Sequence, residues 1–196
     1  QTWTTAKKTI GSGIEAVTTG GTVNIANGTY TGPGNKGIEI NKDVNITGQS
    51  MTGTIIDAEG SGRIFYINSG VTVSIQNLTL KNGNEYDGGA IWNGGTLNVN
   101  KCNFTGNTAD YGGAIENLGT LNVINSIFKD NIASPSSSEG FGGAIDNYGG
   151  QLYAAYNIFT GNFADNGKSL SNFGPYDVQF NFNILDNSGN VIYDET

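Results

Sequence analysis

The sequence predicts an all-β fold: a right-handed, three-sided parallel β-helix (a solenoid) of roughly eight coils with a short N-terminal capping helix. Three observations predict this fold. One motif recurs at a nearly fixed spacing, each repeat contains short stretches of alternating apolar and polar residues, and the 196 residues include 31 glycines. Each stretch is too short to form a sheet alone, and glycine allows the sharp corners between stretches. Stacked repeats would pair the stretches in parallel and bury a continuous core.

We expect a single domain over residues 1–196, with a cap in 1–20 and coils in 21–190. Ile10, Ile14 and Val17 have the i, i+4, i+7 spacing of one helix face, and Thr9 and Ser12 are candidate caps. A short helix here would cover the first coil, with Trp3 packed beside it. Residues 191–196 show no comparable cap: either they form a last strand or the natural protein continues, and we favour a piece of a longer protein.

The repeat is carried by two motifs. Gly-Gly-Ala-Ile occurs at 88–91, 112–115 and 142–145, and Phe-x-x-Asn-x-Ala follows each copy, beginning at Phe104, Phe128 and Phe159. The first interval sets a basic repeat of about 24 residues, a length typical of solenoids. The second interval is longer, and most of its extra residues lie in 134–139, a loop of Ser and Pro. With coils about 4.8 Å apart, the predicted rod is about 40 Å long.

Aligning the repeats predicts which side chains stack inside the coils. The predicted interior columns are Leu97, Leu121 and Leu152; Phe104, Phe128 and Phe159; and Ala90, Ala114 and Ala144. Ile67 precedes Ile91 by the same interval that separates Gly88 from Gly112, so it would extend a column upstream. Cys102 aligns with Leu78 and Ser126, so we expect a buried, inert thiol.

Asparagine recurs at two positions of the repeat. The two series are Asn93, Asn117, Asn147 and Asn172, and Asn107, Asn131, Asn162 and Asn187. Side-chain amides stacked in register can bond to one another and to the backbone of the corners. We therefore expect two ladders that hold turns and do not bind a ligand.

The motifs resemble a known class of repeat. The segments beginning at Gly28 (Gly-Thr-Tyr), Val44 (Val-Asn-Ile-Thr-Gly) and Thr54 (Thr-Ile-Ile-Asp) precede the Gly-Gly-Ala-Ile and Phe-x-x-Asn repeats. Together they resemble the polymorphic outer-membrane-protein type of β-helix repeat and the adhesin-like surface proteins of methanogenic archaea, over about residues 10–190. The resemblance implies a right-handed parallel β-helix, secretion, an extracellular position at the cell surface and a role in adhesion. It implies no catalytic residues, and it suggests that the longer protein is a surface protein.

Composition excludes several classes of function. The net charge of −8 disfavours a nucleic-acid binder. No apolar run reaches the length of about 18 residues that a membrane-spanning helix needs, so we expect no direct membrane insertion in this segment. The absence of histidine removes Ser-His-Asp catalysis and histidine metal sites. We expect a monomer with no cofactor and no metal.

Glu116 and Asp146 raise an enzyme alternative. They share one column directly after the Ala-Ile pairs. Adjacent coils are about 4.8 Å apart, close to the separation of paired carboxylates in glycosidases. A carbohydrate-active enzyme, either a polysaccharide lyase or a glycoside hydrolase, is thus an alternative. Trp92 and Ser171 occupy the same column, so the acid pattern is not sustained. We therefore favour two solvated acids at repeated surface positions.

The same corner also groups acids that could bind calcium and aromatic rings that could bind a partner. The acids are Asp87, Asp110, Glu116, Asp146 and Asp165, but the glycine-rich motif of calcium β-rolls is absent. Aromatic rings beside acids suit glycan stacking or a protein patch. The candidate ligand-binding residues are Trp92, Tyr111, Glu116, Phe141, Asp146 and Tyr148, with Tyr86 nearby. The alternative is that the rings pack under the 134–139 insertion as a small satellite core.

Four Asn-x-Ser/Thr sequons, at Asn27, Asn45, Asn77 and Asn103, are possible glycosylation sites if their side chains face outward. We expect a non-catalytic, adhesin-like module. It would present a rigid face and the insertion loop to a cell-surface glycan or protein of another organism. A purely structural surface spacer is the remaining alternative.

Overall fold

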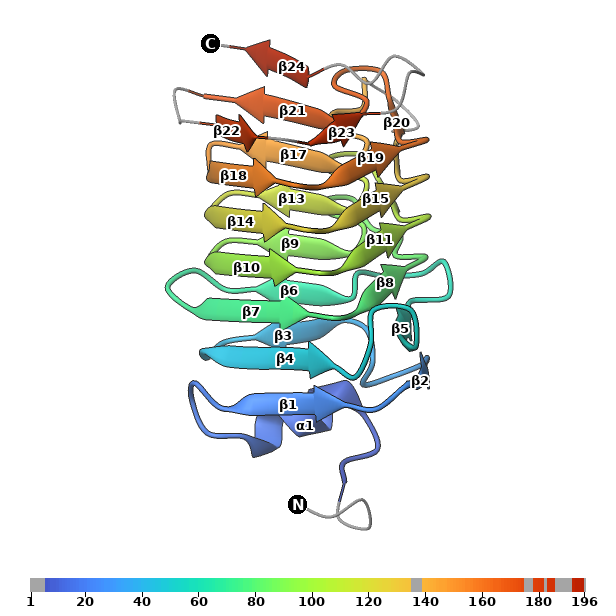
Figure 1. The fold of residues 1–196 in the computed structure, drawn as a ribbon, viewed down its shortest axis with the longest axis vertical. Coiled ribbons are helices and arrows are strands. Elements are labelled where there is room, and N and C mark those ends of the chain that lie inside the picture. The colour runs from blue at the N-terminus through green and yellow to red at the C-terminus, as the bar shows by residue number, and fades with distance from the viewer. Residues whose placement is uncertain (1–5, 135–138, 175–177, 182, 186–191, 196) are drawn as a thin grey trace.

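The computed structural model confirms the parallel β-helix and describes residues 6–134, 139–174, 178–181, 183–185 and 192–195. The strands of one side cross the front of the rod from left to right (Figure 1). The chain then returns from right to left across the back, one level nearer the C-terminus. This winding is right-handed, as expected from the handedness of parallel β crossovers.

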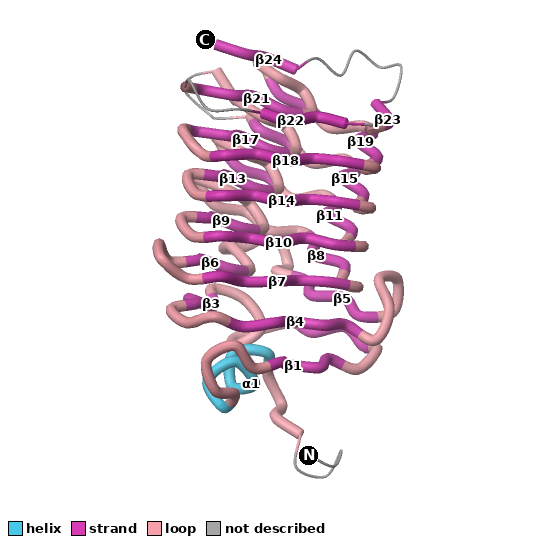
Figure 2. Tube along the Cα trace, turned by 60° about the vertical axis from the view of Figure 1, so that its left-hand side comes forward, coloured by secondary structure: helices cyan, strands magenta, loops and turns pink. Residues whose placement is uncertain are grey.

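Three long parallel sheets form the sides of the rod, and each holds seven of the described strands. Figure 2 shows the strands of sheet A stacked one above another. Sheet A contains, in order, β1 (Thr22–Ile25), β4 (Val44–Gly48), β7 (Thr72–Gln76), β10 (Thr96–Asn100), β14 (Thr120–Ile124), β18 (Gln151–Ala155) and β22 (Val178–Asn181).

The other sheets follow sheet A in every turn. Sheet B contains β2 (Gly28–Tyr30), β5 (Thr54–Asp57), β8 (Thr79–Lys81), β11 (Asn103–Thr105), β15 (Ile127–Lys129), β19 (Ile158–Thr160) and β23 (Ile184–Leu185). Sheet C contains β3 (Ile38–Ile40), β6 (Phe65–Ile67), β9 (Ile91–Asn93), β13 (Ile115–Asn117), β17 (Ile145–Tyr148), β21 (Leu170–Phe173) and β24 (Ile192–Glu195). A short sheet D contains β12 (Thr108–Ala109), β16 (Ile132–Ala133) and β20 (Phe163–Ala164).

The number of coils is slightly smaller than the predicted eight, because several turns lengthen the repeat. Val44 pairs with Val73, and Leu121 pairs with Leu152; both intervals exceed the basic repeat. The prediction for Ile67 was wrong for the same reason: Ile91 pairs with Phe65. The turn from β6 to β7, over 68–71, is longer than the turn from β9 to β10, over 94–95.

Helix α1 (Ile10–Ala16) lies below the first strand at the N-terminal end of the rod (Figure 1). Thr9 is its N-cap: the Thr9 hydroxyl accepts a hydrogen bond from the Ser12 amide at 3.2 Å, which completes a capping box. Ile10 and Ile14 are buried in the same core cluster as Val23 of β1. The predicted cap helix is therefore present, while Trp3 lies outside the described residues.

The interior is built from columns of identical side chains in register. Phe104, Phe128 and Phe159 pair along sheet B, with ring centroids 4.8 and 4.9 Å apart and nearly parallel planes. The leucine column and the alanine column are buried as predicted. Cys102 is also buried, and loss of solvation raises the pKa of its thiol to about 12.

Both asparagine ladders form. Asn93 donates through Nδ2 to Oδ1 of Asn117, Asn117 donates to Asn147, and Asn147 donates to Asn172, each at 2.7 Å. The second ladder joins Asn107, Asn131 and Asn162 by bonds of 2.9 Å, and Asn187 lies outside the described residues. These buried amides satisfy one another and the turn backbone, so their role is structural.

Candidate functional site at the glycine corner of sheet C

The Gly-Gly pairs fix the path of the chain into sheet C. The first glycine of each pair, Gly88, Gly112 or Gly142, has φ of 57, 60 or 64°. A Cβ atom there would collide with the carbonyl oxygen of the isoleucine three residues later. A Cβ on the second glycine would collide with backbone of the next coil. Only glycine permits this turn, which we call the glycine corner.

The glycine corners stack on one another through their backbones. Asp87, Tyr111, Phe141 and Asn166 form successive parallel bridges. The amide of Gly88 donates to the carbonyl of Tyr111 at 2.7 Å, and equivalent bonds continue along the rod. Tyr111 and Phe141 therefore occupy the slot that Asp87 fills one coil earlier, as the repeat predicts.

Five aromatic rings form a continuous row beside these corners, which we call the aromatic row: Tyr86, Tyr111, Phe141, Phe173 and Tyr148. Tyr111 lies edge-on to Tyr86 at 5.6 Å and parallel to Phe141 at 6.1 Å. Phe173 contacts Phe141 at 4.8 Å and Tyr148 at 6.0 Å. Tyr111 and Phe141 are half-buried, whereas Tyr86 and Tyr148 are 60% and 58% exposed. The middle of the row packs, and its ends face solvent.

Trp92 belongs to a separate stack. Its ring lies 4.3 Å from that of Tyr66, with an angle of 5° between the planes. The Arg63 guanidinium lies 5.5 Å from the centre of the Tyr66 ring, and its Nε donates to the carbonyl of Asp87 at 3.0 Å. The structure therefore brings Tyr111, Phe141 and Tyr148 together but places Trp92 in its own stack.

The two acids are buried, so the expectation of solvated acids was wrong. Glu116 is 7% exposed and Asp146 is 0% exposed, although both occupy outward positions of sheet C. Both acids lie close to the glycine corners: the backbone at Gly112 passes beside the Glu116 amide, and that at Gly142 beside the Asp146 amide. The Ser171 hydroxyl donates to Oδ1 of Asp146. Among the described residues, nothing donates a hydrogen bond to Oε2 of Glu116 or Oδ2 of Asp146.

Burial makes both carboxyl groups weak acids. Loss of solvation, reinforced by Asp87 and Asp146 and opposed by Arg63, raises the pKa of Glu116 to about 8. Loss of solvation also raises the pKa of Asp146 to about 7, although the bond from Ser171 opposes the rise. At neutral pH Glu116 holds a proton, so this outward position carries less negative charge than its sequence suggests.

Sequence reasoning missed Arg63 as a member of this cluster. Desolvation lowers the pKa of its guanidinium, while Glu85, Asp87 and Glu116 act to raise it. Arg63 precedes Asp87 by one basic repeat, so the repeat spacing is the signal that links them. Phe173 was also missed, although it follows the ladder residue Asn172 as Tyr148 follows Asn147.

The chemistry open to this corner is limited by its burial. Paired carboxyl groups with raised pKa values suit proton transfer, but substrate contact requires exposure that Glu116 and Asp146 lack. In the part of the chain that is described, no three His, Cys, Asp or Glu side chains are grouped to hold a metal ion.

Residues 101–117 match the Chlamydia polymorphic membrane protein (Chlamydia_PMP) repeat. The match runs from β11 through one Phe-x-x-Asn motif and one glycine corner to the ladder residue Asn117. It covers about one coil, so the polymorphic-membrane-protein type of repeat is supported there. No curated protein and no solved structure matches the chain significantly.

The structure places the four sequons in different settings. Asn27 is exposed, although its Oδ1 accepts bonds from the Ser50 and Thr54 hydroxyls. Asn45, Asn77 and Asn103 are half-buried, and Oδ1 of Asn103 is covered. By exposure, Asn27 is therefore the most accessible of the four candidate glycosylation sites.

Most of the insertion, residues 135–138, lies outside the described residues. At its end, Glu139 accepts a bond of 2.8 Å from Asn166, which belongs to the stacked corners. Among the described residues, the helical segment falls short of the length and apolarity needed to cross a membrane.

Proposed function

We propose that this chain is a non-catalytic, adhesin-like module at a cell surface, which binds a glycan or protein on another cell through the aromatic row. One observation carries the proposal: the tyrosines at both ends of the row are exposed although neighbouring rings hold the row in place. Aromatic side chains that are fixed before binding lose little freedom when a partner arrives. The surface location is supported by the match to a repeat named for a membrane protein.

The non-catalytic part of the proposal is supported by the burial of the acid pair. Raised pKa values favour a glycosidase-like alternative, because catalytic acids are often tuned in this way. A polysaccharide, however, finds little of Glu116 and none of Asp146 at the surface, because their exposed fractions are 7% and 0%. We therefore assign the pair a structural role.

The test compares two exposed tyrosines on the purified chain. Tyr148 is 58% exposed in the aromatic row, and Tyr156 is 59% exposed at the turn after β18. Fluorescently labelled protein is applied to a panel of fixed whole cells. We expect Tyr148→Ala to weaken binding about tenfold and the matched control Tyr156→Ala to leave it unchanged. Periodate and protease treatment of the cells separate a glycan partner from a protein partner.

Three outcomes would count against the proposal. Failure of the wild type to bind any cell favours a spacer. Binding that survives Tyr86→Ala/Tyr148→Ala moves the site away from the aromatic row. Release of reducing ends or unsaturated sugars from the glycans, abolished by Glu116→Gln, would show an enzyme instead.

A further inference from the structure

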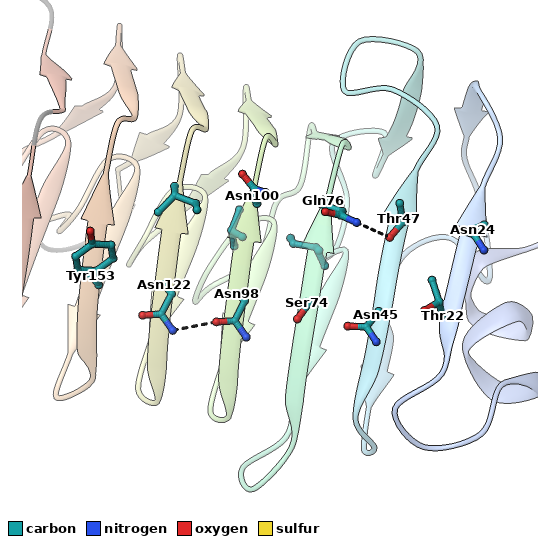
Figure 3. Close-up of a pocket in the computed structure, with 13 residues that line it drawn as sticks. Thr22, Asn24, Asn45, Thr47, Ser74, Gln76, Asn98, Asn100, Asn122 and Tyr153 are labelled. Atoms are coloured by element: carbon teal, nitrogen blue, oxygen red, sulfur yellow. Dashed lines mark hydrogen bonds between the residues drawn. The ribbon is translucent and has the colours of Figure 1, made fainter.

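The outward face of sheet A forms a second surface feature, separate from the aromatic row and the acid pair; of the residues assigned a role above, only the sequon residue Asn45 lines it. A shallow hollow of about 740 Å³ extends across the strands from β1 to β18. Figure 3 shows side chains from these strands projecting from one side of the sheet. The hollow therefore crosses six stacked strands and runs along the axis of the rod.

The side chains of this hollow form columns set by the strand register. Asn45, Ser74, Asn98, Asn122 and Tyr153 follow one another in the main column. Every one of them is uncharged. Neighbouring positions in the column are about 4.8 Å apart because each belongs to the next strand of the sheet.

A parallel column runs two residues further along each strand, and it is also uncharged. It contains Asn24, Thr47, Gln76 and Asn100 in register and ends at the apolar residue Ile124. The two columns therefore present amide and hydroxyl groups side by side, in a chain whose net charge is −8. The hollow holds no described carboxylate or ammonium group in its lining.

The other long sheets differ from this face. On sheet B, Lys81 and Asp57 form an ion pair at 3.1 Å, and Lys129 is exposed nearby. On sheet C, the outward positions of β13 and β17 hold the buried acids Glu116 and Asp146. Among the described strands, sheet A thus provides the long, open and uncharged polar face.

Neighbouring side chains orient the amides of the hollow. Asn122 donates to Oδ1 of Asn98 at 2.9 Å, and Gln76 donates to the Thr47 hydroxyl at 3.1 Å (Figure 3). A side-chain amide has two donor hydrogens and two acceptor lone pairs, so one such bond leaves capacity for a ligand. Tyr153 closes the C-terminal end of the hollow with a ring that is 37% exposed.

We propose that this hollow binds a neutral polysaccharide whose chain lies along the rod, across the strands of sheet A. The strand spacing is close to the length of one sugar unit in an extended chain, so successive units meet successive pairs of amides and hydroxyls. Tyr153 provides the apolar surface on which one sugar ring stacks. An anionic polymer finds no counter-charge in the hollow. For a protein partner, the centre of the hollow offers Ser74 and Asn98, whereas protein interfaces are usually anchored by apolar or aromatic side chains at the centre.

The test measures retardation of the whole chain in native gels that contain a polysaccharide. The probes are mixed-linkage β-glucan, galactomannan and xyloglucan, with polygalacturonate as the anionic comparison. The protein is made in a host that does not glycosylate Asn45, because a glycan there would occupy the hollow. We expect retardation by at least one neutral polymer. Ser74→Glu should abolish it, and Tyr153→Ala should weaken it about tenfold.

Matched controls make the test specific. Thr105→Glu adds the same charge at a half-exposed outward position of sheet B and should leave retardation unchanged. Tyr148→Ala removes a tyrosine of the aromatic row and should also leave retardation unchanged. The test of this inference is therefore independent of the test of cell binding by the aromatic row. If the circular dichroism spectrum shows that the Ser74→Glu variant is not folded, the inference is judged from the effect of Tyr153→Ala on retardation alone.

Two results would overturn the inference. One is that no neutral polymer retards the protein, whether or not polygalacturonate does. The other is retardation of the wild type that neither Ser74→Glu nor Tyr153→Ala reduces, which would place the polysaccharide elsewhere.

Discussion

Glu116 and Asp146 show how a residue's surroundings can reverse the chemistry that its sequence position suggests. Alternation along β13 and β17 places both side chains outward, and outward acids are ordinarily solvated. Both side chains are nevertheless buried beside the glycine corners, and burial raises the pKa of both groups. The direction of a side chain follows from the two-residue period of the strand, whereas its exposure depends on which neighbouring segments pack against it.

The raised pKa of Glu116 predicts a stability that falls as the pH rises. Its pKa is about 8 in the folded chain and about 4.3 when unfolded. Between these values the folded state keeps a proton that the unfolded state releases. The contribution of Glu116 to the free energy of unfolding should therefore fall by a few kcal/mol from about pH 4 to pH 8, and Asp146, whose pKa is raised to about 7, adds to the fall. Urea titrations at several pH values measure this slope.

Glu116→Gln should remove the part of this dependence that Glu116 causes, since the amide is nearly the same shape and does not titrate, and leave the part caused by Asp146. Glu39→Gln is the matched control, because Glu39 lies in the same outward column on β3 and is exposed. A slope that is equally steep in the Glu116→Gln variant would contradict a protonated Glu116.

At the scale of elements, the asparagine ladders join one coil to the next. Asn131 accepts bonds from the backbone amide and the side chain of Asn107 through Oδ1. Its Nδ2 donates to the carbonyl of Phe104 and to Oδ1 of Asn162. All of these bonds are buried, so each coil depends on its neighbours for satisfied polar groups.

Asn131→Ala should destabilise the protein by about 3 kcal/mol or more, because it leaves several buried donors and acceptors unpaired. Asn122→Ala removes a half-exposed asparagine with one side-chain hydrogen bond to Asn98 and should cost less than about 1 kcal/mol. Chemical denaturation of both variants measures the difference. Equal losses of unfolding free energy in the two variants would mean that burial does not determine how much a side-chain hydrogen bond between asparagines stabilises the protein.

The elements that could be predicted are those that repeat. The Phe104 column, both ladders and the α1 cap follow from spacing and capping residues alone. The pairing of Ile91 with Phe65 could not be obtained by counting back one basic repeat, since a longer turn leaves the strands unchanged and shifts the register. The candidate site was only partly predictable, because Tyr66, which stacks on Trp92, and Phe173, which contacts Phe141, belong to coils that lack the Gly-Gly-Ala-Ile motif.

For the molecule as a whole, the stacking of coils predicts that damage at one end stays local. Each coil contacts mainly its neighbours, so stability is close to a sum of coil and interface contributions. Ile14→Asp places a charge in the buried face of α1 against the first coil. Hydrogen exchange should accelerate in β1 and remain slow in β14, as measured by mass spectrometry.

Ile132→Asp provides a comparison at an exposed position of β16, where the same charge stays in solvent and should not alter exchange in β1. Uniform acceleration throughout the chain in the Ile14→Asp variant would contradict local behaviour and show one cooperative unit instead.

In the first ladder every side-chain hydrogen bond runs from an N-terminal donor to a C-terminal acceptor. The order of donor and acceptor is therefore the same at each joint, which makes the joint compatible with duplication of a coil. Asn93, Asn117 and Asn147 each direct a donor toward the C-terminal neighbour. A copied coil inserted between β9 and β13 would meet a donor on one side and an acceptor on the other. The coils of β13 and β17 carry both halves of the joint, so this part of the rod can lengthen or shorten in whole units while the adjoining coils keep their sequences.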